Sequence, residues 1–198
     1  MQRSWAAHEF LETNELLRKL TADIELHAFC SNATNDPELK NILQRHIKGM
    51  DQTYHQAIQL LQNKGANMRA TAGYNQHSQH HPHVGMQNPT MIPAPNTQAN
   101  RLSDFTMGTI ILNSHKAGSM FGMLWANECV DPDVRSLHVM SANNCQQMAY
   151  EIWQFMNNRG YYEAPMMPAN QVTMMNQTYQ PLAATYTANN AMHTNHLI

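Results

Sequence analysis

The sequence repeats one pattern at a constant offset of 95 residues, and this repeat limits what the chain can fold into. The run Asp-Pro-Glu-Leu-Lys at 36–40 returns as Asp-Pro-Asp-Val-Arg at 131–135. The register then continues without a gap to Gly65 and Gly160. Most substitutions between the copies replace a residue with one of similar chemical type. A duplicated structural unit explains such a pattern, so we expect two equivalent halves.

Each copy is typical of a helix, a tight turn and a second helix, because apolar residues recur at three-four spacing on both sides of the Asp-Pro pair. Asp36 and Asp131 can accept backbone N–H groups as N-caps, and the proline after each suits the first helical position. A glycine that tolerates positive φ closes each copy, at Gly65 and Gly160. The predicted helices cover residues 5–30, 37–64, 103–129 and 132–159.

One hairpin of this kind cannot bury its own apolar stripe, whereas two facing hairpins can. We therefore predict an all-α, ferritin-like four-helix bundle made of two duplicated helical hairpins with a long crossover connection. The expected organisation is a first hairpin, an irregular His/Pro-rich crossover, a second hairpin that forms one bundle with the first, and a polar Asn/Gln/Tyr/Met-rich tail. These parts cover residues 1–65, 66–101, 102–160 and 161–198.

The chain is poor in charge. Charged residues make up 13% of the 198 residues, about half the usual quarter, and the net charge is −2. Such a surface repels its own copies weakly, which favours assembly, and it argues against a nucleic-acid or anionic-membrane partner. No apolar run approaches transmembrane length, and the N-terminus lacks the apolar core of a secretory signal.

The predicted architecture is also that of di-metal carboxylate proteins, whose site needs Glu-x-x-His pairs on two helices. No glutamate of this chain has a histidine three residues later. The nearest substitute is a set of residues that we place near mid-bundle by counting from the two turns: Glu15, Asp51, His55, His115 and Glu151. This remnant could hold one adventitious ion, but we interpret these residues as surface or snorkelling polar groups.

We accordingly expect no cofactor and no metal site. The bundle centre is predicted to be filled by aliphatic and aromatic packing, from Leu17, Ile24, Leu43, Met50, Leu112, Cys145 and Ile152. No phosphate-binding glycine loop, Gly-x-Ser-x-Gly sequence or cysteine with an evident histidine base is present. The sequence therefore predicts a protein without catalytic residues.

The cysteines and the crossover histidines leave alternatives open. Cys30, Cys129 and Cys145 form no Cys-x-x-Cys pair and fit small buried residues, although an odd number also allows a disulfide between chains. Four histidines lie close together in the crossover, at His77, His80, His81 and His83. They could bind Ni²⁺ or Zn²⁺ weakly, but an irregular segment lacks a preorganised geometry.

Four motifs in the second half resemble the spore coat F family of endospore-forming bacteria. They are 110–116 (Ile-Ile-Leu-Asn-Ser-His-Lys), 127–129 (Asn-Glu-Cys), 131–135 and 155–162 (Phe-Met-Asn-Asn-Arg-Gly-Tyr-Tyr). The closing motif is the most specific of the four. Val134 and Arg159 depart from the leucine and lysine that are commoner in the family, and the first half resembles the family more loosely.

The resemblance implies a ferritin-like fold without a working di-metal centre. It further implies a structural component of the spore coat, made in the mother-cell cytoplasm, with other coat proteins and further copies of this chain as partners. Two alternatives stay open at this point. One is a ferritin-like metal-binding oxidase or catalase-like enzyme, and the other is a bundle that binds a small molecule.

Overall fold

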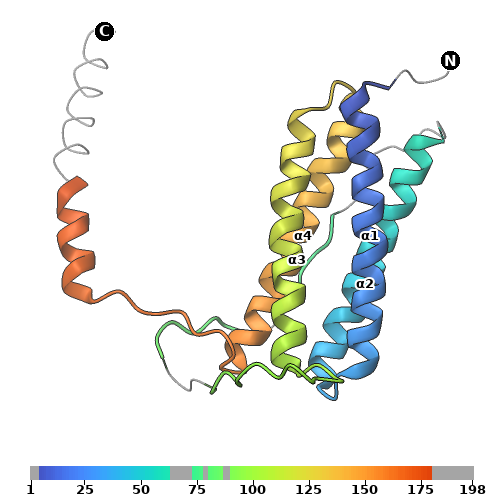
Figure 1. Cartoon of the computed structure of the whole chain (residues 1–198). Helices are drawn as coiled ribbons and strands as arrows, with labels where there is room; N and C mark the ends of the chain where they lie inside the picture. The colour runs from blue at the N-terminus through green and yellow to red at the C-terminus, as the bar shows by residue number, and fades with distance from the viewer. Residues whose placement is uncertain (1–4, 63–72, 78–79, 87–89, 180–198) are drawn as a thin grey trace, which may run out of the picture.

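The computed structural model of the chain describes residues 5–62, 73–77, 80–86 and 90–179. Four long helices form a bundle (Figure 1): α1 (Ala7–Ala33), α2 (Pro37–Leu61), α3 (Asp104–Asn127) and α4 (Pro132–Asn158). A further helical segment covers residues 169–179. The prediction of an all-α bundle is confirmed, and among the described residues the only β-type pairing is an isolated bridge between Val84 and Ala164. No described helix is both long enough and apolar enough to cross a membrane.

The predicted helix starts are present in atomic detail. The Asp36 carboxylate accepts the backbone N–H groups of Glu38 and Leu39, at 2.9 and 3.3 Å. Asp131 caps α4 in the same way, through the two residues that follow Pro132. Gly160 follows α4 with a φ of +70°, as expected for a closing glycine. Gly65, the predicted closing residue of the first copy, lies outside the described residues.

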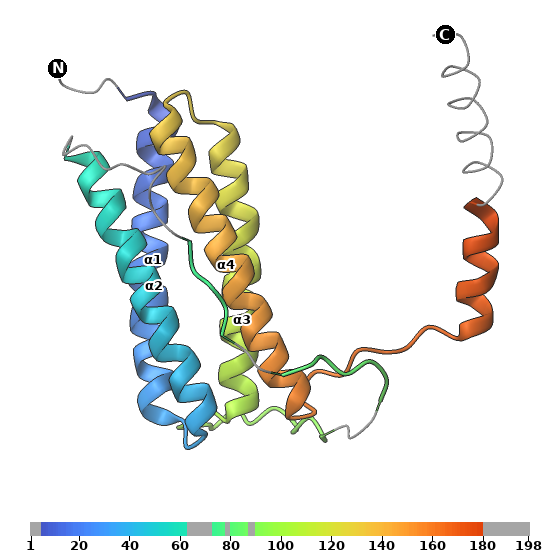
Figure 2. The ribbon, with the colours of Figure 1, turned by 180° about the vertical axis from the view of Figure 1, so that it is seen from behind.

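The two hairpins pack with their turns at opposite ends of the bundle. The turn between α1 and α2 lies at the lower end in Figure 1, whereas the turn between α3 and α4 lies at the upper end. Figure 2 shows the same arrangement from behind. Residues at equal distances from their own turns therefore do not share a level.

The core consists of two apolar clusters stacked along the bundle. One is formed by Cys30, Leu39, Ile42, Leu43, Met107, Ile111, Leu112, Ala149, Ile152, Phe155 and Met156. The other is formed by Leu16, Leu20, Met50, Ala57, Leu60, Leu137 and Met148. Every helix contributes to this core, so the bundle buries the apolar stripes that a single hairpin would leave exposed.

Close packing of α3 on α4 depends on glycine. A Cβ atom on Gly122 would lie 3.2 Å from the Cα and N atoms of Ala142, so the two backbones can approach only because Gly122 has no side chain. Gly108 faces the flexible side chain of Met156 instead. The small residues of α3 thus bring its buried face close to α4.

The connection that leads from α2 to α3 passes beside α4 (Figure 2), and polar side chains of α4 hydrogen-bond to it. Gln154 donates from Nε2 to the carbonyl oxygen of His80, and Asn157 donates from Nδ2 to that of His83, each at 3.2 Å. The N–H of His83 donates in return to Asn157 Oδ1 at 2.8 Å. These contacts explain why α4 buries polar residues, because they satisfy backbone groups of an irregular segment.

Candidate functional site

A polar layer lies at the centre of the bundle, where only apolar packing was expected. His27 of α1, His46 of α2 and His115 of α3 are fully buried, and each offers a ring nitrogen within 4.8 Å of the others. Along its helix, each histidine falls beside or between residues of the two apolar clusters. Of the residues predicted to fill the centre, Leu43, Met50, Leu112, Cys145 and Ile152 are buried, whereas Leu17 and Ile24 are only partly buried. The prediction that aliphatic and aromatic packing alone fills the centre is wrong, because it left out the three histidines.

The ring nitrogens that face one another are held in short contacts. His27 Nε2 lies 3.1 Å from His115 Nε2, and His46 Nδ1 lies 3.3 Å from the same His115 atom. The rings are tilted rather than stacked, with centroids 5.0 to 5.6 Å apart. The three nitrogens thus converge on one small volume.

The remaining nitrogens of two rings fix the tautomers. His27 Nδ1 lies 2.6 Å from the carbonyl oxygen of Asp23, which can only accept, so Nδ1 carries the proton and Nε2 presents a lone pair. His46 Nε2 donates to Glu151 Oε2 at 3.1 Å, so its Nδ1 also presents a lone pair. His115 Nδ1 is buried and has no hydrogen-bond partner among the described residues.

Glu151 of α4 accepts hydrogen bonds from the groups around this layer. Its fully buried carboxylate accepts a hydrogen bond from Arg45 at 2.6 Å, the His46 bond just described, and one from the hydroxyl of Tyr74. The backbone N–H of His77 donates to it as well, at 3.2 Å. A buried carboxylate is tolerated when its acceptor sites are filled in this way.

Burial and neighbours decide the charges of these groups. Burial lowers the pKa of His27 to about 3, and the neighbouring His46 adds to the effect. Burial also lowers the pKa of His46 despite the opposing Glu151, and lowers that of His115 further with help from the other two rings. Burial alone would raise the pKa of Glu151, but hydrogen bonds from His46, Tyr74 and Arg45 lower it to about 2. At neutral pH the layer therefore contains three neutral imidazoles and one carboxylate.

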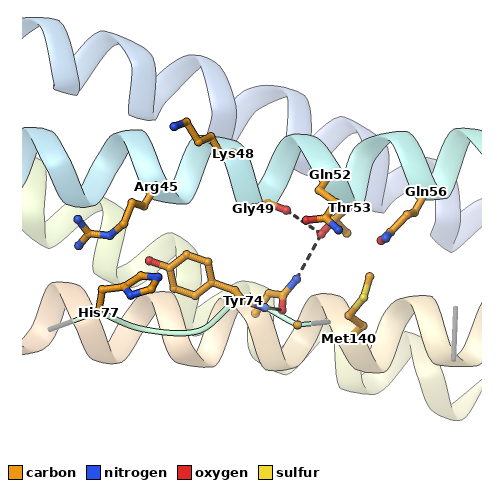
Figure 3. A pocket seen from close by; sticks show the side chains of 11 residues that line it. Arg45, Lys48, Gly49, Gln52, Thr53, Gln56, Tyr74, His77 and Met140 are labelled. Carbon is orange, nitrogen blue, oxygen red and sulfur yellow. Dashed lines mark hydrogen bonds between the residues drawn. The ribbon is translucent and has the colours of Figure 1, made fainter. Parts of the chain in front are cut away.

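Tyr74 covers the layer from the connecting segment. Its ring meets the His46 ring edge-on at 5.4 Å, and its backbone N–H donates to Asn144 of α4 at 2.8 Å. Figure 3 shows Tyr74 between α2 and α4, close to Arg45 and His77, at the edge of a pocket of about 260 Å³. The segment thus closes the groove between α2 and α4 over His46.

The structure separates the five remnant residues predicted from the sequence. Glu15, Asp51 and His55 have side chains 58%, 58% and 66% exposed, whereas His115 and Glu151 are fully buried at the centre. Interpreting the last two as surface groups was therefore wrong. His115 and Glu151 lie on the buried faces of α3 and α4, with Leu112 and Ile152. Placing all five residues at one level was also wrong, because the two turns lie at opposite ends of the bundle (Figure 1).

Sequence reasoning missed His27 and His46, although a signal for both was present. His46 lies between Leu43 and Met50 at three-four spacing, so it falls on the apolar stripe of α2. On α1, His27 lies on the same buried face as Leu20 and Cys30. Histidines in register with apolar stripes on separate helices indicate a buried polar layer.

The arrangement does not fit a di-metal carboxylate centre. Such a centre needs a glutamate from each of four helices, and two of them must belong to Glu-x-x-His pairs. Among the described residues the metal-capable cluster consists of the three histidines, and Glu151 is already bound to Arg45, His46 and Tyr74. The donor set instead resembles sites in which neutral imidazoles bind one ion.

The comparisons with known proteins all match proteins or domains with spore coat names. Residues 103–165, which include α3 and α4, match the Coat F domain. The chain is 23% identical over 174 residues to the spore coat protein F-like protein YhcQ of Bacillus subtilis (strain 168), covering 88% of this chain and 80% of that protein. A crystal structure from Bacillus halodurans C-125, whose protein carries a provisional spore coat designation, matches with a TM-score of 0.61. That match has 17% identity and covers 84% of this chain and 97% of the other, and it supports the fold.

Proposed function

We propose that this chain, a member of the Coat F family through residues 103–165, is a structural component of the bacterial spore coat. It is made in the mother-cell cytoplasm and enters the coat by assembling with other coat proteins and with further copies of itself. The spore coat names of its relatives support this role. The structural observation that carries it is an exposed apolar surface on the Coat F domain.

Helix α3 exposes apolar side chains that its own bundle does not cover. Met120, Phe121 and Leu124 are 72%, 48% and 55% exposed. Phe121 and Leu124 line an open groove of about 630 Å³, together with Trp125 and residues of α1. Contiguous apolar surface of this kind marks an interaction site rather than an ordinary solvated helix face.

The helical segment at residues 169–179 also exposes apolar side chains. It stands clear of the bundle in Figures 1 and 2, and all of its residues are exposed. Val172, Met174 and Met175 are among its exposed apolar side chains, and it contains no charged residue. A helix of this length is marginal without packing. We infer that it docks into the α3 groove of a second copy, which links subunits in the coat.

The polar layer supports a role without catalysis. The Glu151 carboxylate is occupied by Arg45, His46 and Tyr74. The nearby Asp23 carboxylate pairs with Lys19 and Ser114, so among the described residues no free carboxylate base faces the histidines. The alternative of a ferritin-like oxidase or catalase-like enzyme lacks the carboxylate set that such chemistry uses. Purified protein loaded with iron or manganese should therefore oxidise Fe²⁺ and decompose peroxide no faster than the free ions.

Fractionation of sporulating cells tests the proposal. We expect the chain in the coat extract of mature spores and a fluorescent fusion in a shell around the forespore. The variant with Phe121→Ser and Leu124→Ser should keep its helical content and Tm but disappear from the coat extract. Recovery of the wild-type chain only in the soluble mother-cell fraction contradicts the proposal.

A matched control tests whether coat incorporation depends on the α3 groove itself or on any exposed apolar surface. Met91 and Ile92 are 91% and 67% exposed, lie on the connecting segment and do not line the α3 groove. Changing both to serine removes similar apolar area and should leave coat incorporation intact. Equal loss in both double variants would show that the groove has no special part in assembly.

A further inference from the structure

We propose that His27, His46 and His115 bind a single divalent ion of the Zn²⁺ class at the centre of the bundle. The inference does not depend on the proposed coat function. It rests on where the three nitrogens lie, on which of them carry protons, and on what surrounds them.

Counting protons shows that the three converging nitrogens have at most one donor for two acceptors. His27 Nε2 and His46 Nδ1 both present lone pairs, because their partner nitrogens donate to Asp23 and Glu151. Without an ion, His115 Nε2 must supply a single proton to two acceptors, and its Nδ1 then becomes a buried acceptor without a donor. A metal ion satisfies all three converging lone pairs at once.

The distances fit one ion. With Zn–N bonds of about 2.05 Å in a tetrahedron, ligand nitrogens lie roughly 3.3 Å apart. The nitrogens of His27 and His46 lie 3.1 and 3.3 Å from that of His115. Two of the three spacings are thus close to the required value, and the third, between His27 and His46, is within 4.8 Å. The ligands come from three helices.

The donor atoms select the class of metal. Three neutral imidazoles suit Zn²⁺, Cu²⁺, Ni²⁺ or Fe²⁺, whereas Mg²⁺ and Ca²⁺ require oxygen ligands. The hydrogen bonds from His27 to the Asp23 carbonyl and from His46 to the Glu151 carboxylate have the form that orients histidine ligands in known sites. Glu151 and His115 lie in the Coat F domain, whereas His27 and His46 come from the first hairpin, so the ion joins the two halves.

The surrounding charges indicate what completes the coordination. Lys19 pairs with Asp23, and Arg45 pairs with Glu151, so both nearby carboxylates are neutralised before an ion binds. The protein supplies three ligands and no net charge. We infer that a solvent-derived or small anionic ligand takes the fourth position, as in three-histidine zinc sites.

Titration with Co²⁺, a spectroscopic substitute for Zn²⁺, tests the site on the full chain purified without a polyhistidine tag and stripped with a chelator. We expect one Co²⁺ per chain, with the intense visible absorption of four-coordinate Co²⁺, and displacement by one Zn²⁺. Azide should shift the spectrum because the fourth position exchanges. His115→Gln should weaken binding about 100-fold or more, and Glu151→Gln roughly 10- to 100-fold.

Two controls locate the site. His55→Gln removes an exposed histidine of α2, and the double variant with His81→Gln and His83→Gln removes exposed histidines of the connecting segment. Both should bind Co²⁺ like the wild type. His27→Gln replaces His115→Gln if circular dichroism shows that the latter does not fold. Wild-type protein that binds no stoichiometric Co²⁺ overturns the proposal. Wild-type affinity in a folded His115→Gln variant, or loss of binding in the segment variant, overturns it as well.

Discussion

His46 donates from Nε2 to the carboxylate of Glu151 at 3.1 Å and turns its Nδ1 toward His115 at 3.3 Å. One side chain of α2 thereby connects α4 to α3 through the middle of the bundle. The contact joins the two hairpins by polar groups at the centre of the bundle, so both stability and ion binding should respond to changes at Glu151.

Glu151→Gln should lower the free energy of unfolding by about 2 kcal/mol in the presence of a chelator, because Arg45 loses its charged partner and His46 a strong acceptor. Arg45 is one-third exposed, and solvent moderates the loss. Urea unfolding measures the change. Asp51→Asn, which alters an exposed carboxylate of α2, should stay within about 0.5 kcal/mol of the wild type. Equal effects of the two changes would mean that Glu151 has no special structural role.

Stability should fall with acid because of His138. Burial lowers the pKa of this ring from 6.5 to about 4, so the unfolded chain takes up a proton more readily than the folded one. Its contribution is complete above pH 6.5 and is lost as the pH falls toward 4.

Unfolding of metal-free protein between these pH values checks this expectation. The slope for His138→Gln should be shallower than that of the wild type by up to about 1.4 kcal/mol per pH unit. His55→Gln, at an exposed position, should keep the wild-type slope. Parallel curves for the wild type and His138→Gln would contradict the assignment.

Gly122→Ala should destabilise the bundle by about 1–3 kcal/mol, because the new Cβ meets the backbone of Ala142 at 3.2 Å. Gly108→Ala meets only the flexible side chain of Met156, so the gain in helix propensity should leave Tm unchanged or higher. Thermal unfolding of the two variants measures the difference. A Gly122→Ala protein as stable as Gly108→Ala would show that α3 and α4 are not in backbone contact there.

Asp36→Ala should cost about 1–2 kcal/mol, because Asp36 both caps α2 and accepts a hydrogen bond from Arg159 Nε at 3.0 Å. Asp36→Asn keeps the capping oxygen but replaces Oδ2, the acceptor of Arg159, with an NH2 group, so it removes the ion pair and leaves the cap; its effect should be the smaller one. Denaturant titration compares them. If Asp36→Asn proves as harmful as Asp36→Ala, the ion pair rather than the cap fixes the start of α2.

The helices and their starts could be predicted because their signals are local. Asp36 and Asp131 bind backbone groups two and three residues ahead, and Gly160 takes the positive φ that a glycine after a helix commonly adopts. The bundle follows from the apolar stripes. The motifs between Ile110 and Tyr162 are also continuous in sequence, so their resemblance to the Coat F domain could be recognised.

The polar centre could not be predicted in the same way, because it depends on how the hairpins face each other. The repeat gives no help: at the offset of 95 residues, His27 corresponds to Gly122 (27 + 95 = 122) and His46 to Ser141 (46 + 95 = 141). The cluster therefore breaks the internal symmetry. The distances of His115 and Glu151 from their turn became informative only once the two turns were placed at opposite ends.

The most direct test of the three-histidine centre is a crystal structure of the full chain grown with Zn²⁺, with diffraction data collected on both sides of the zinc absorption edge. The anomalous difference map should contain one strong peak per chain within bonding distance of His27 Nε2, His46 Nδ1 and His115 Nε2. A map with no peak there, and with zinc bound only at the exposed histidines His55, His81 or His83, would contradict the assignment.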